Sequence, residues 1–305
     1  MKTGSDVSPF ATRPAPDAAL AELTRINTAD MLESFGLQHV RRGRSLLELA
    51  CRWPARRFAR TVLEFDRRVG ELGLAAAAAW GMARFAARLH VVGGEQIPRQ
   101  GPVLFLANHP GITDTLALFA ALQRSDLRTI AAARPFLANL AHTMQQLIFV
   151  DPDSGSQLAV VRAGSRHLRR GGAVLTFPAG RIEPDPAVLP GAATALDNWS
   201  PSIDLLARLA PETQVTPVLV SGVFSPRAAA SPLVRLRRSQ EDRERFAAML
   251  QIVAPARFPV TVTVQVGAAL PPGSGKTAAV SAMRELLTQS PIANLQLPIP
   301  APPMD

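Results

Sequence analysis

A chain of 305 residues, 47% of them hydrophobic, can form a large core, which excludes a protein that is disordered throughout. The net charge of +9 indicates an anionic partner, but aromatic residues make up only 5% and tyrosine is absent, unlike the stacking surfaces that bind single-stranded nucleic acid. The composition therefore favours an anionic membrane surface or a phosphorylated substrate over nucleic acid.

The N-terminal residues 1–18 are polar and rich in proline, without the apolar segment of a secretory signal. We therefore expect a disordered leader and no signal peptide. The single cysteine, Cys51, excludes an internal disulfide framework and fits a reducing compartment, where it would serve as a small filler on a helix face. These features predict a cytoplasmic protein.

The region 19–90 has helical spacing, and we expect helices over 19–38, 44–69 and 71–90. The second of these is the most basic part of the chain and carries Trp and Phe between its arginines. Such amphipathic helices are typical of an interfacial membrane element, since each basic residue near an anionic bilayer contributes about 1 kcal/mol. The alternative is a helical pair packed on the rest of the protein with a solvated arginine face. No apolar segment is long enough to span a bilayer alone.

From residue 91 short apolar runs alternate with helical spacing, which predicts an α/β domain over 91–290. The alternating segment 260–266 is expected to be a half-exposed or edge strand, and residues 291–305 a loose proline-rich tail. The expected strands are 103–107, 128–132, 147–150, 173–177, 215–220 and 258–266, and the expected helices lie near 114–123, 136–145, 156–170, 200–209, 239–251 and 276–288.

A histidine and an aspartate lie where the first of these strands meets the next helix. His109 follows the buried run 103–107, and Asp114 stands at the expected helix start, where aspartate is a favoured N-cap residue. The turn between them contains Pro110 and Gly111 and can fold the two side chains toward each other. A carboxylate that fixes the imidazole tautomer and stabilises the imidazolium is what a general base needs.

This pair, preceded by Asn108, resembles the H-x4-D signature of the glycerolipid acyltransferase family. Three later segments resemble the other motifs of that family and follow in the same order: 147–151, Phe177-Pro-Ala-Gly-Arg181 and Thr216-Pro-Val218. The H-x4-D spacing alone is weak evidence, whereas the ordered set is specific. The resemblance implies a mostly parallel, mixed sheet flanked by helices, here with an N-terminal helical element.

The resemblance also implies a reaction, the transfer of a fatty acyl group from an acyl-CoA or acyl-ACP thioester to a hydroxyl of a glycerol phosphate or lysophospholipid. His109 would take the hydroxyl proton and Asp114 would support the resulting cation, a step that typically contributes about 10²–10⁴-fold. No metal or redox cofactor is implied, and no metal-ligand spacing appears in the sequence. The expected place is the inner face of the cell membrane, bound peripherally.

The third motif is expected to bind the acceptor. Gly180 would let the backbone approach the ligand, and Arg181 carries a forked donor set suited to phosphate or carboxylate. The family has a glutamate where Ala179 stands and an arginine where Ile182 stands. Arg181 would then substitute after a one-residue slip and Glu183 would replace the missing carboxylate. Alternatively, Arg181 pairs structurally with Glu183 or Asp185.

The second and fourth motifs raise similar questions. Pro152 stands where the family commonly has a phosphate-contacting arginine and offers neither a charge nor an N–H, so Arg134 or Arg162 would supply the charge. Pro217 would shape the loop end of a strand near the acyl channel, or simply terminate that strand. The departures leave open an acyltransferase for a lipid acceptor without phosphate, and a catalytically weak, membrane-binding relative. The expected substrate-binding residues are Asn108, Arg134, Gly180, Arg181, Glu183 and Pro217.

Overall fold

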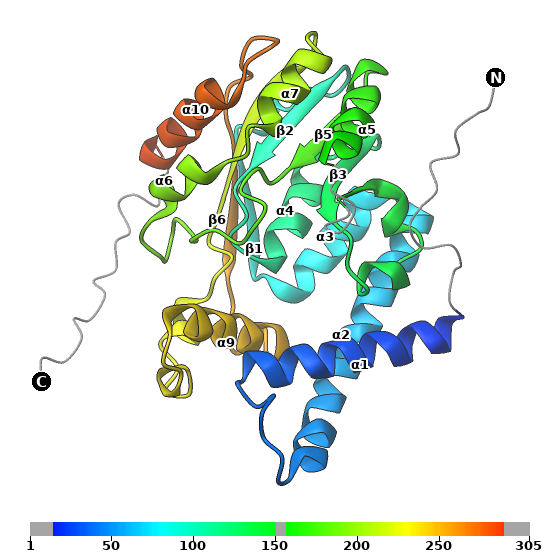
Figure 1. Cartoon of the computed structure of the whole chain (residues 1–305), viewed down its shortest axis with the longest axis vertical. Coiled ribbons are helices and arrows are strands. Elements are labelled where there is room, and N and C mark those ends of the chain that lie inside the picture. Colours follow the sequence, from blue (N-terminus) through cyan, green and yellow to red (C-terminus); the bar gives the residue numbers. More distant parts are fainter. Residues whose placement is uncertain (1–14, 151–156, 290–305) are drawn as a thin grey trace, which may run out of the picture.

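The computed structural model describes residues 15–150 and 157–289, and its centre is a seven-stranded sheet in the order β1-β7-β6-β2-β5-β3-β4 (Figure 1). Strands β6, β2, β5, β3 and β4 are parallel, whereas β1 and β7 run antiparallel to them. The predicted mostly parallel, mixed sheet is confirmed. The strands are β1 (Arg88–Val92), β2 (Val103–Ala107), β3 (Leu127–Ala132), β4 (Leu147–Val150), β5 (Ala173–Thr176), β6 (Gln214–Ser221) and β7 (Thr261–Val266).

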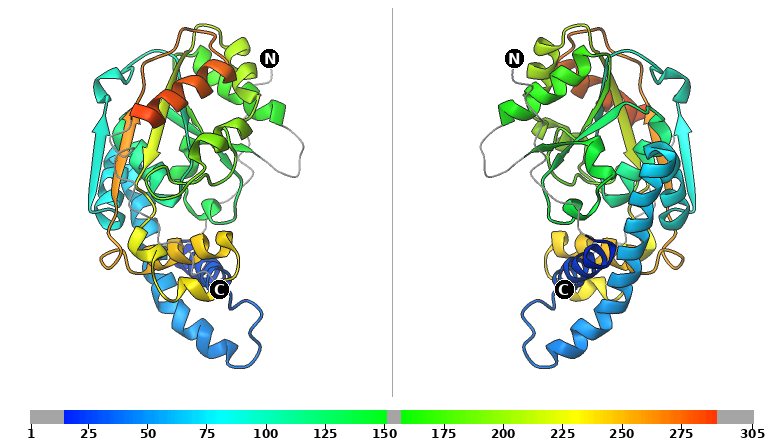
Figure 2. Two further views of the ribbon diagram at one scale, coloured as in Figure 1. Left: turned by 90° about the vertical axis from the view of Figure 1, so that its left-hand side faces the viewer. Right: turned by 90° about the vertical axis from the view of Figure 1, so that its right-hand side faces the viewer.

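Helices cover both faces of the sheet (Figures 1 and 2). Helices α3 and α4 pack on one face, and α5, α7 and α10 pack on the other. The helices are α1 (Pro16–Ser34), α2 (Arg44–Leu72), α3 (Leu74–Phe85), α4 (Ile112–Leu122), α5 (Gln157–Arg169), α6 (Ala192–Ala195), α7 (Ser202–Leu209), α8 (Pro226–Ala229), α9 (Gln240–Val253) and α10 (Lys276–Gln289).

The central strand β2 explains why its sequence is an uninterrupted apolar run. All five of its residues are buried, because helices cover both faces of the sheet. Phe105 and its alternate neighbours point into the core under α3 and α4, whereas Leu104 and Leu106 point into the core under α5, α7 and α10. A strand held on both sides in this way gives the residues that follow it a fixed position.

The N-terminal helical element is also present. Helices α1 and α9 and the first half of α2 lie together at one end of the molecule (Figure 1). Met31 of α1 and Cys51 of α2 share a small apolar core with Met249 of α9. Cys51 is therefore a buried filler, as expected. Helix α1 begins at Pro16, inside the expected leader, whereas residues 1–14 and the expected tail 291–305 lie outside the described residues.

The expected helix 71–90 is wrong in both of its bounds. Gly73, with φ +85°, separates α2 from α3, and α3 ends at Phe85. The next residues form the strand β1, which pairs with β7. Strand β7 therefore lies between β1 and β6 and is not at the edge of the sheet. The sequence does not show where β1 begins, because the strand closely follows an alanine-rich helix and its pairing partner is far away in the chain.

The expected helix 136–145 is replaced by two short 3₁₀ turns, Leu137–Asn139 and Thr143–Gln146. The buried carboxylate of Asp66 in α2 accepts hydrogen bonds from the backbone N–H groups of His142 (3.1 Å) and Thr143 (2.7 Å), and from the Thr143 hydroxyl (2.7 Å). These bonds take backbone donors that a continuous helix would use internally. A tertiary contact thus outweighs the local helical spacing.

Candidate active site

His109 and Asp114 meet at the carboxyl end of β2. His109 Nδ1 lies 2.7 Å from Asp114 Oδ2, and Asp114 is fully buried. The carboxylate also accepts hydrogen bonds from the Gly111 N–H (2.9 Å) and the Thr115 hydroxyl (2.9 Å). Asp114 is the third residue of α4 and not its N-cap, which is Gly111. The carboxylate nevertheless lies in the first helical turn, where a negative charge is stabilised.

The imidazole of His109 is only partly covered by the protein. Its side chain is 26% exposed, and Nε2 makes no hydrogen bond with any residue that the structure describes. The Phe177 ring packs against the imidazole with ring centroids 4.4 Å apart. If Nδ1–H donates to Asp114, the Nε2 lone pair of the neutral ring is available to accept a proton.

The pKa of His109 lies above the ordinary histidine value. Burial opposes the charged imidazolium and lowers the pKa, but the hydrogen bond and negative charge of Asp114 outweigh it, helped by the charge of Glu183. The positive charge of Arg134 acts in the opposite direction. The imidazole is thus more basic than usual, because the interactions with the two carboxylates outweigh its burial and this positive charge.

Glu183 holds the backbone of His109. Its carboxylate accepts hydrogen bonds from the His109 N–H (2.9 Å) and the Trp199 indole N–H (3.0 Å), and its own N–H donates to the His109 carbonyl (2.8 Å). Burial raises the pKa of Glu183 against these bonds. Glu183, which was expected to replace the missing family glutamate, is only 4% exposed and is bound to the turn that carries His109.

Asp185, two residues further, joins the loop after β5 to the loop after β6. Its buried carboxylate accepts hydrogen bonds from the N–H groups of Ala187 (3.0 Å), Gly222 (2.9 Å) and Phe224 (2.8 Å). Burial raises its pKa in spite of these donors. Neither Glu183 nor Asp185 pairs with Arg181, so the structural alternative for Arg181 is wrong.

Asn108 ties the end of β2 to β6. Its side-chain amide donates to the Val220 carbonyl (2.8 Å), and its side-chain oxygen accepts from the Val220 N–H (2.7 Å). The side chain is buried, and both polar ends of its amide are used within the protein. Asn108 was expected to contact the substrate, but its side chain is bound to Val220 and supports the turn that carries His109.

Arg181 and Gly180 lie on the exposed side of the turn after β5. Gly180 has φ +64°, which favours glycine, and its N–H donates to the Phe177 carbonyl (3.0 Å). The exposed Arg181 makes no hydrogen bond or ion pair with the residues in 15–150 and 157–289. Arg134 is also exposed and follows β3. Two exposed arginines therefore follow β3 and β5, at the same end of the sheet as His109.

Pro217 does not lie where it was expected. It is a buried residue in the middle of β6, paired with Leu106 of β2, and the strand continues to Ser221. Its carbonyl accepts from the Gly267 N–H (2.9 Å), just beyond the pairing between β6 and β7. A proline is tolerated there because its missing donor falls where the antiparallel ladder has ended. Pro217 neither shapes a strand end nor terminates the strand.

The site lies at a topological switch point. Helix α4 leaves β2 on one face of the sheet, whereas the chain leaving the neighbouring strand β5 returns through α7 on the other face. Open α/β sheets bind ligands in the crevice outside the carboxyl ends of two such strands. His109 follows the first of these strands and Phe177 the second.

Three residues of the site were not among the expected site residues: Phe177 beside the imidazole, Trp199 and Asp185. Phe177 belongs to the third motif, and a second carboxylate soon after that motif was a visible signal for Asp185. Trp199 has no such signal. Within the described residues, no group of three or more His, Cys, Asp or Glu side chains is placed to hold a metal ion.

Two comparisons relate this chain to known proteins. Residues 88–219 match the model of the family described as Acyltransferase. A crystal structure of the 1-acyl-sn-glycerophosphate acyltransferase PlsC from Thermotoga maritima shares 16% sequence identity, with a TM-score of 0.43, over 92% of this chain and 97% of that one. No curated protein matches the sequence.

Proposed function

We propose that this chain, whose residues 88–219 match the model of the Acyltransferase family, transfers an acyl group from a CoA or acyl carrier protein thioester to a hydroxyl of a glycerol phosphate or lysophospholipid. The observation that carries the proposal is the imidazole of His109, bound to a buried carboxylate through Nδ1 and free at Nε2. The acyl thioester is a co-substrate, and no further cofactor is invoked.

His109 acts as the general base. Nε2 takes the proton of the acceptor hydroxyl while the hydroxyl oxygen attacks the thioester carbonyl carbon. The carbon–sulfur bond then breaks, the ester forms, and the leaving thiolate takes the proton from the imidazolium. Asp114 stabilises the imidazolium between these steps, and a base positioned in this way contributes about 10²–10⁴-fold. No covalent intermediate with the protein is needed.

The acceptor we favour carries a phosphate. Arg181 follows β5, and its guanidinium has no partner among the described residues, while Arg134 follows β3. Both loops lie at the end of the sheet that carries His109, and two guanidinium groups there suit a phosphate, which each can bind through a pair of N–H donors. Arg162 lies on α5, beside Arg166 and Arg169 in a separate cavity, and is the weaker candidate for this charge.

We also propose that α2 contacts an anionic membrane surface on the inner face of the cell membrane. Its first half projects from the end of the molecule (Figure 2) and exposes Leu46 (73%), Leu49 (66%) and Trp53 (70%). Exposed arginines flank these side chains. Apolar side chains beside basic ones suit the boundary between head groups and acyl chains. No helix among the described residues is long and apolar enough to span a membrane.

An acceptor panel tests the proposal. Purified protein is mixed with an acyl thioester and glycerol 3-phosphate, lysophosphatidate or a monoacylglycerol, and the released thiol is measured. We expect thiol release with the phosphate-bearing acceptors, and loss of that release in His109→Ala but not in His90→Ala, which changes an exposed histidine of β1. Turnover with monoacylglycerol alone would refute the phosphate acceptor. Silence across the panel would favour a membrane-binding protein without this activity.

A further inference from the structure

A second candidate site lies in a cavity of about 260 Å³ between α2, the end of α3 and the end of α9. The aromatic rings of Phe58 and Phe85 and the side chain of Ile252 form part of its apolar wall, and the exposed Arg57 and Arg84 also line it. None of the residues around His109 contributes to this cavity. The cavity therefore combines an apolar wall with two cations, outside the catalytic site.

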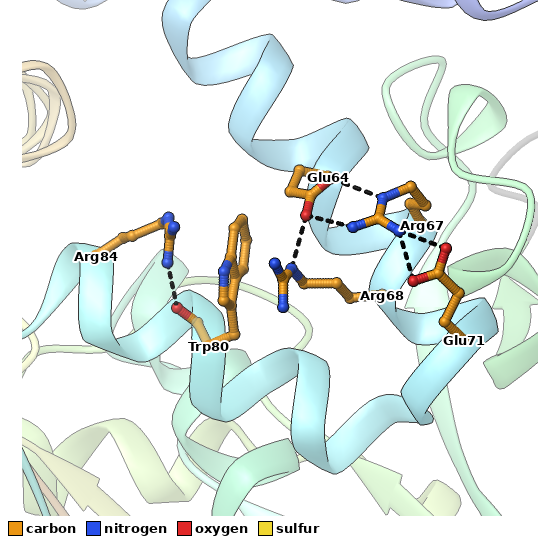
Figure 3. Close-up of polar contacts among 6 residues, drawn as sticks. All are labelled: Glu64, Arg67, Arg68, Glu71, Trp80 and Arg84. Atoms are coloured by element: carbon orange, nitrogen blue, oxygen red, sulfur yellow. Dashed lines mark hydrogen bonds and ion pairs between the residues drawn. The ribbon is translucent and has the colours of Figure 1, made fainter.

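Arg84 is held in place by Trp80. Figure 3 shows the side chains of Arg68 and Arg84 on opposite faces of the indole, with their guanidinium carbons 4.6 and 3.6 Å from the ring centre. Arg84 also donates a hydrogen bond to the Trp80 carbonyl (3.1 Å). A stacked guanidinium has lost much of its freedom before a ligand arrives, which lowers the entropic cost of binding.

Arg84 differs from its neighbours because no carboxylate neutralises it. Glu64 accepts hydrogen bonds from both Arg67 (2.7 Å) and Arg68 (2.7 Å), and Glu71 pairs with Arg67 (Figure 3). Within residues 15–150 and 157–289, no carboxylate pairs with Arg84. A held cation with spare N–H donors is suited to an anionic ligand.

Arg57, the second cation, connects the cavity to the exposed face of α2. Its guanidinium lies 5.9 Å from the ring centre of Trp53, and it too has no carboxylate partner in the described part of the chain. Trp53 is one of the exposed side chains proposed above to contact a membrane. A ligand in the cavity would thus lie next to that surface.

The cavity and His109 are at the same end of the sheet. Phe85 lies three residues before β1, whose first residue, Arg88, pairs with Thr261 at the start of β7. The start of β7 pairs with the end of β6, the strand beside β2. Both sites would therefore approach a membrane from the same side.

We propose that this cavity binds the phosphate-bearing head group of an anionic bilayer phospholipid, separately from the acceptor site. Arg57 and Arg84 bind the phosphate, and the apolar wall contacts the glycerol and the first part of the acyl chains. The proposal rests on the membrane contact of α2 for the source of its ligand. It gives the enzyme a means of recognising anionic lipid that does not occupy the catalytic site.

The test uses a short-chain phosphatidylglycerol below its critical micelle concentration, so that no bilayer is present. Binding to the full chain is measured by calorimetry, with short-chain phosphatidylcholine and inorganic phosphate as comparison ligands. We expect saturable binding of phosphatidylglycerol alone. The variant Arg57→Gln/Arg84→Gln should weaken it at least about tenfold, whereas Arg41→Gln/Arg42→Gln, which removes two exposed charges of the same basic region, should not.

Two further measurements separate this proposal from the proposed function. Arg134→Gln/Arg181→Gln alters the acceptor site and should leave phosphatidylglycerol binding unchanged, while Arg57→Gln/Arg84→Gln should still acylate a soluble acceptor. Binding that is equal in wild type and Arg57→Gln/Arg84→Gln would overturn the assignment of the cavity, as would the absence of saturable binding. Inorganic phosphate that binds as tightly as phosphatidylglycerol would make the ligand a free anion and overturn the lipid assignment.

Discussion

His109 and Glu183 are 74 residues apart in the chain, yet each donates a backbone N–H to the other, Glu183 to the carbonyl of His109 and His109 to the carboxylate of Glu183. The turn after β2 is thereby fixed to the loop after β5. The orientation of the imidazole depends on this connection as well as on Asp114.

The Asp114 carboxylate should control the pH profile. A general base must be neutral, so kcat/KM rises with pH through the pKa of His109, which lies above the ordinary histidine value. Asp114→Asn removes the main interactions that raise this pKa and leaves the burial that lowers it. We expect the acid limb to move to lower pH and kcat to fall by about 10²-fold or more. Asp17→Asn, in the exposed first turn of α1, is the matched control and should change neither. An unmoved acid limb in Asp114→Asn would exclude His109 as the titrating base.

Trp199 should contribute to stability through Glu183. Trp199→Phe removes the indole N–H that binds the buried carboxylate and leaves some space beside it. The free energy of unfolding, measured in urea, should fall by about 1–3 kcal/mol. The same change at Trp53, which is 70% exposed, should alter it by less than about 0.5 kcal/mol. Equal effects of the two changes would contradict the importance of this hydrogen bond.

The guanidinium groups near the site should matter only for acceptors that carry a phosphate. Arg181→Gln and Arg134→Gln should each raise the KM for such an acceptor by about tenfold, since each removes a charge-assisted contact, and should leave the KM for the thioester unchanged. Arg162→Gln, the same change on α5, serves as the control. If Arg162→Gln raised the KM and the other two did not, the acceptor phosphate would bind elsewhere.

The exposed apolar side chains of α2 should contribute to membrane binding. Leu49→Ala/Trp53→Ala should reduce sedimentation with anionic vesicles by about tenfold, because both side chains lose their contact with the acyl region. Leu158→Ala/Leu209→Ala removes two exposed leucines from α5 and α7 and should have little effect. Wild-type binding should also weaken with added salt, owing to the surrounding arginines. Identical sedimentation of the two double variants would refute the contact.

The parts of the site that could be predicted from sequence are local. His109 and Asp114 are five residues apart, so one turn between a strand and a helix brings them together, and the alternating pattern of the chain is sufficient to predict an α/β sheet. Glu183 was singled out for its charge, but its contact with His109 depends on β5 lying beside β2, which no local pattern reveals. The same holds for Asn108, whose partner Val220 is on β6.

The errors have a common physical origin. The helix expected over 136–145 is interrupted because Asp66, far away in the chain, binds its backbone N–H groups. Strand β1 closely follows an alanine-rich helix in the chain, and its residues form a strand because β7 pairs with them. Pro217 occupies a central strand because the neighbouring ladder ends beside it. In each case a tertiary contact overrides a local preference.

The pairing of β1 with β7 has a consequence for how the protein is made. Residues 88–92 are synthesised well before their partner strand, 261–266. The nascent chain must therefore carry an unpaired strand, and leave the neighbouring edge of β6 uncovered, until β7 has been translated. This side of the sheet cannot close before that point, and a chain truncated before β7 would be prone to aggregate.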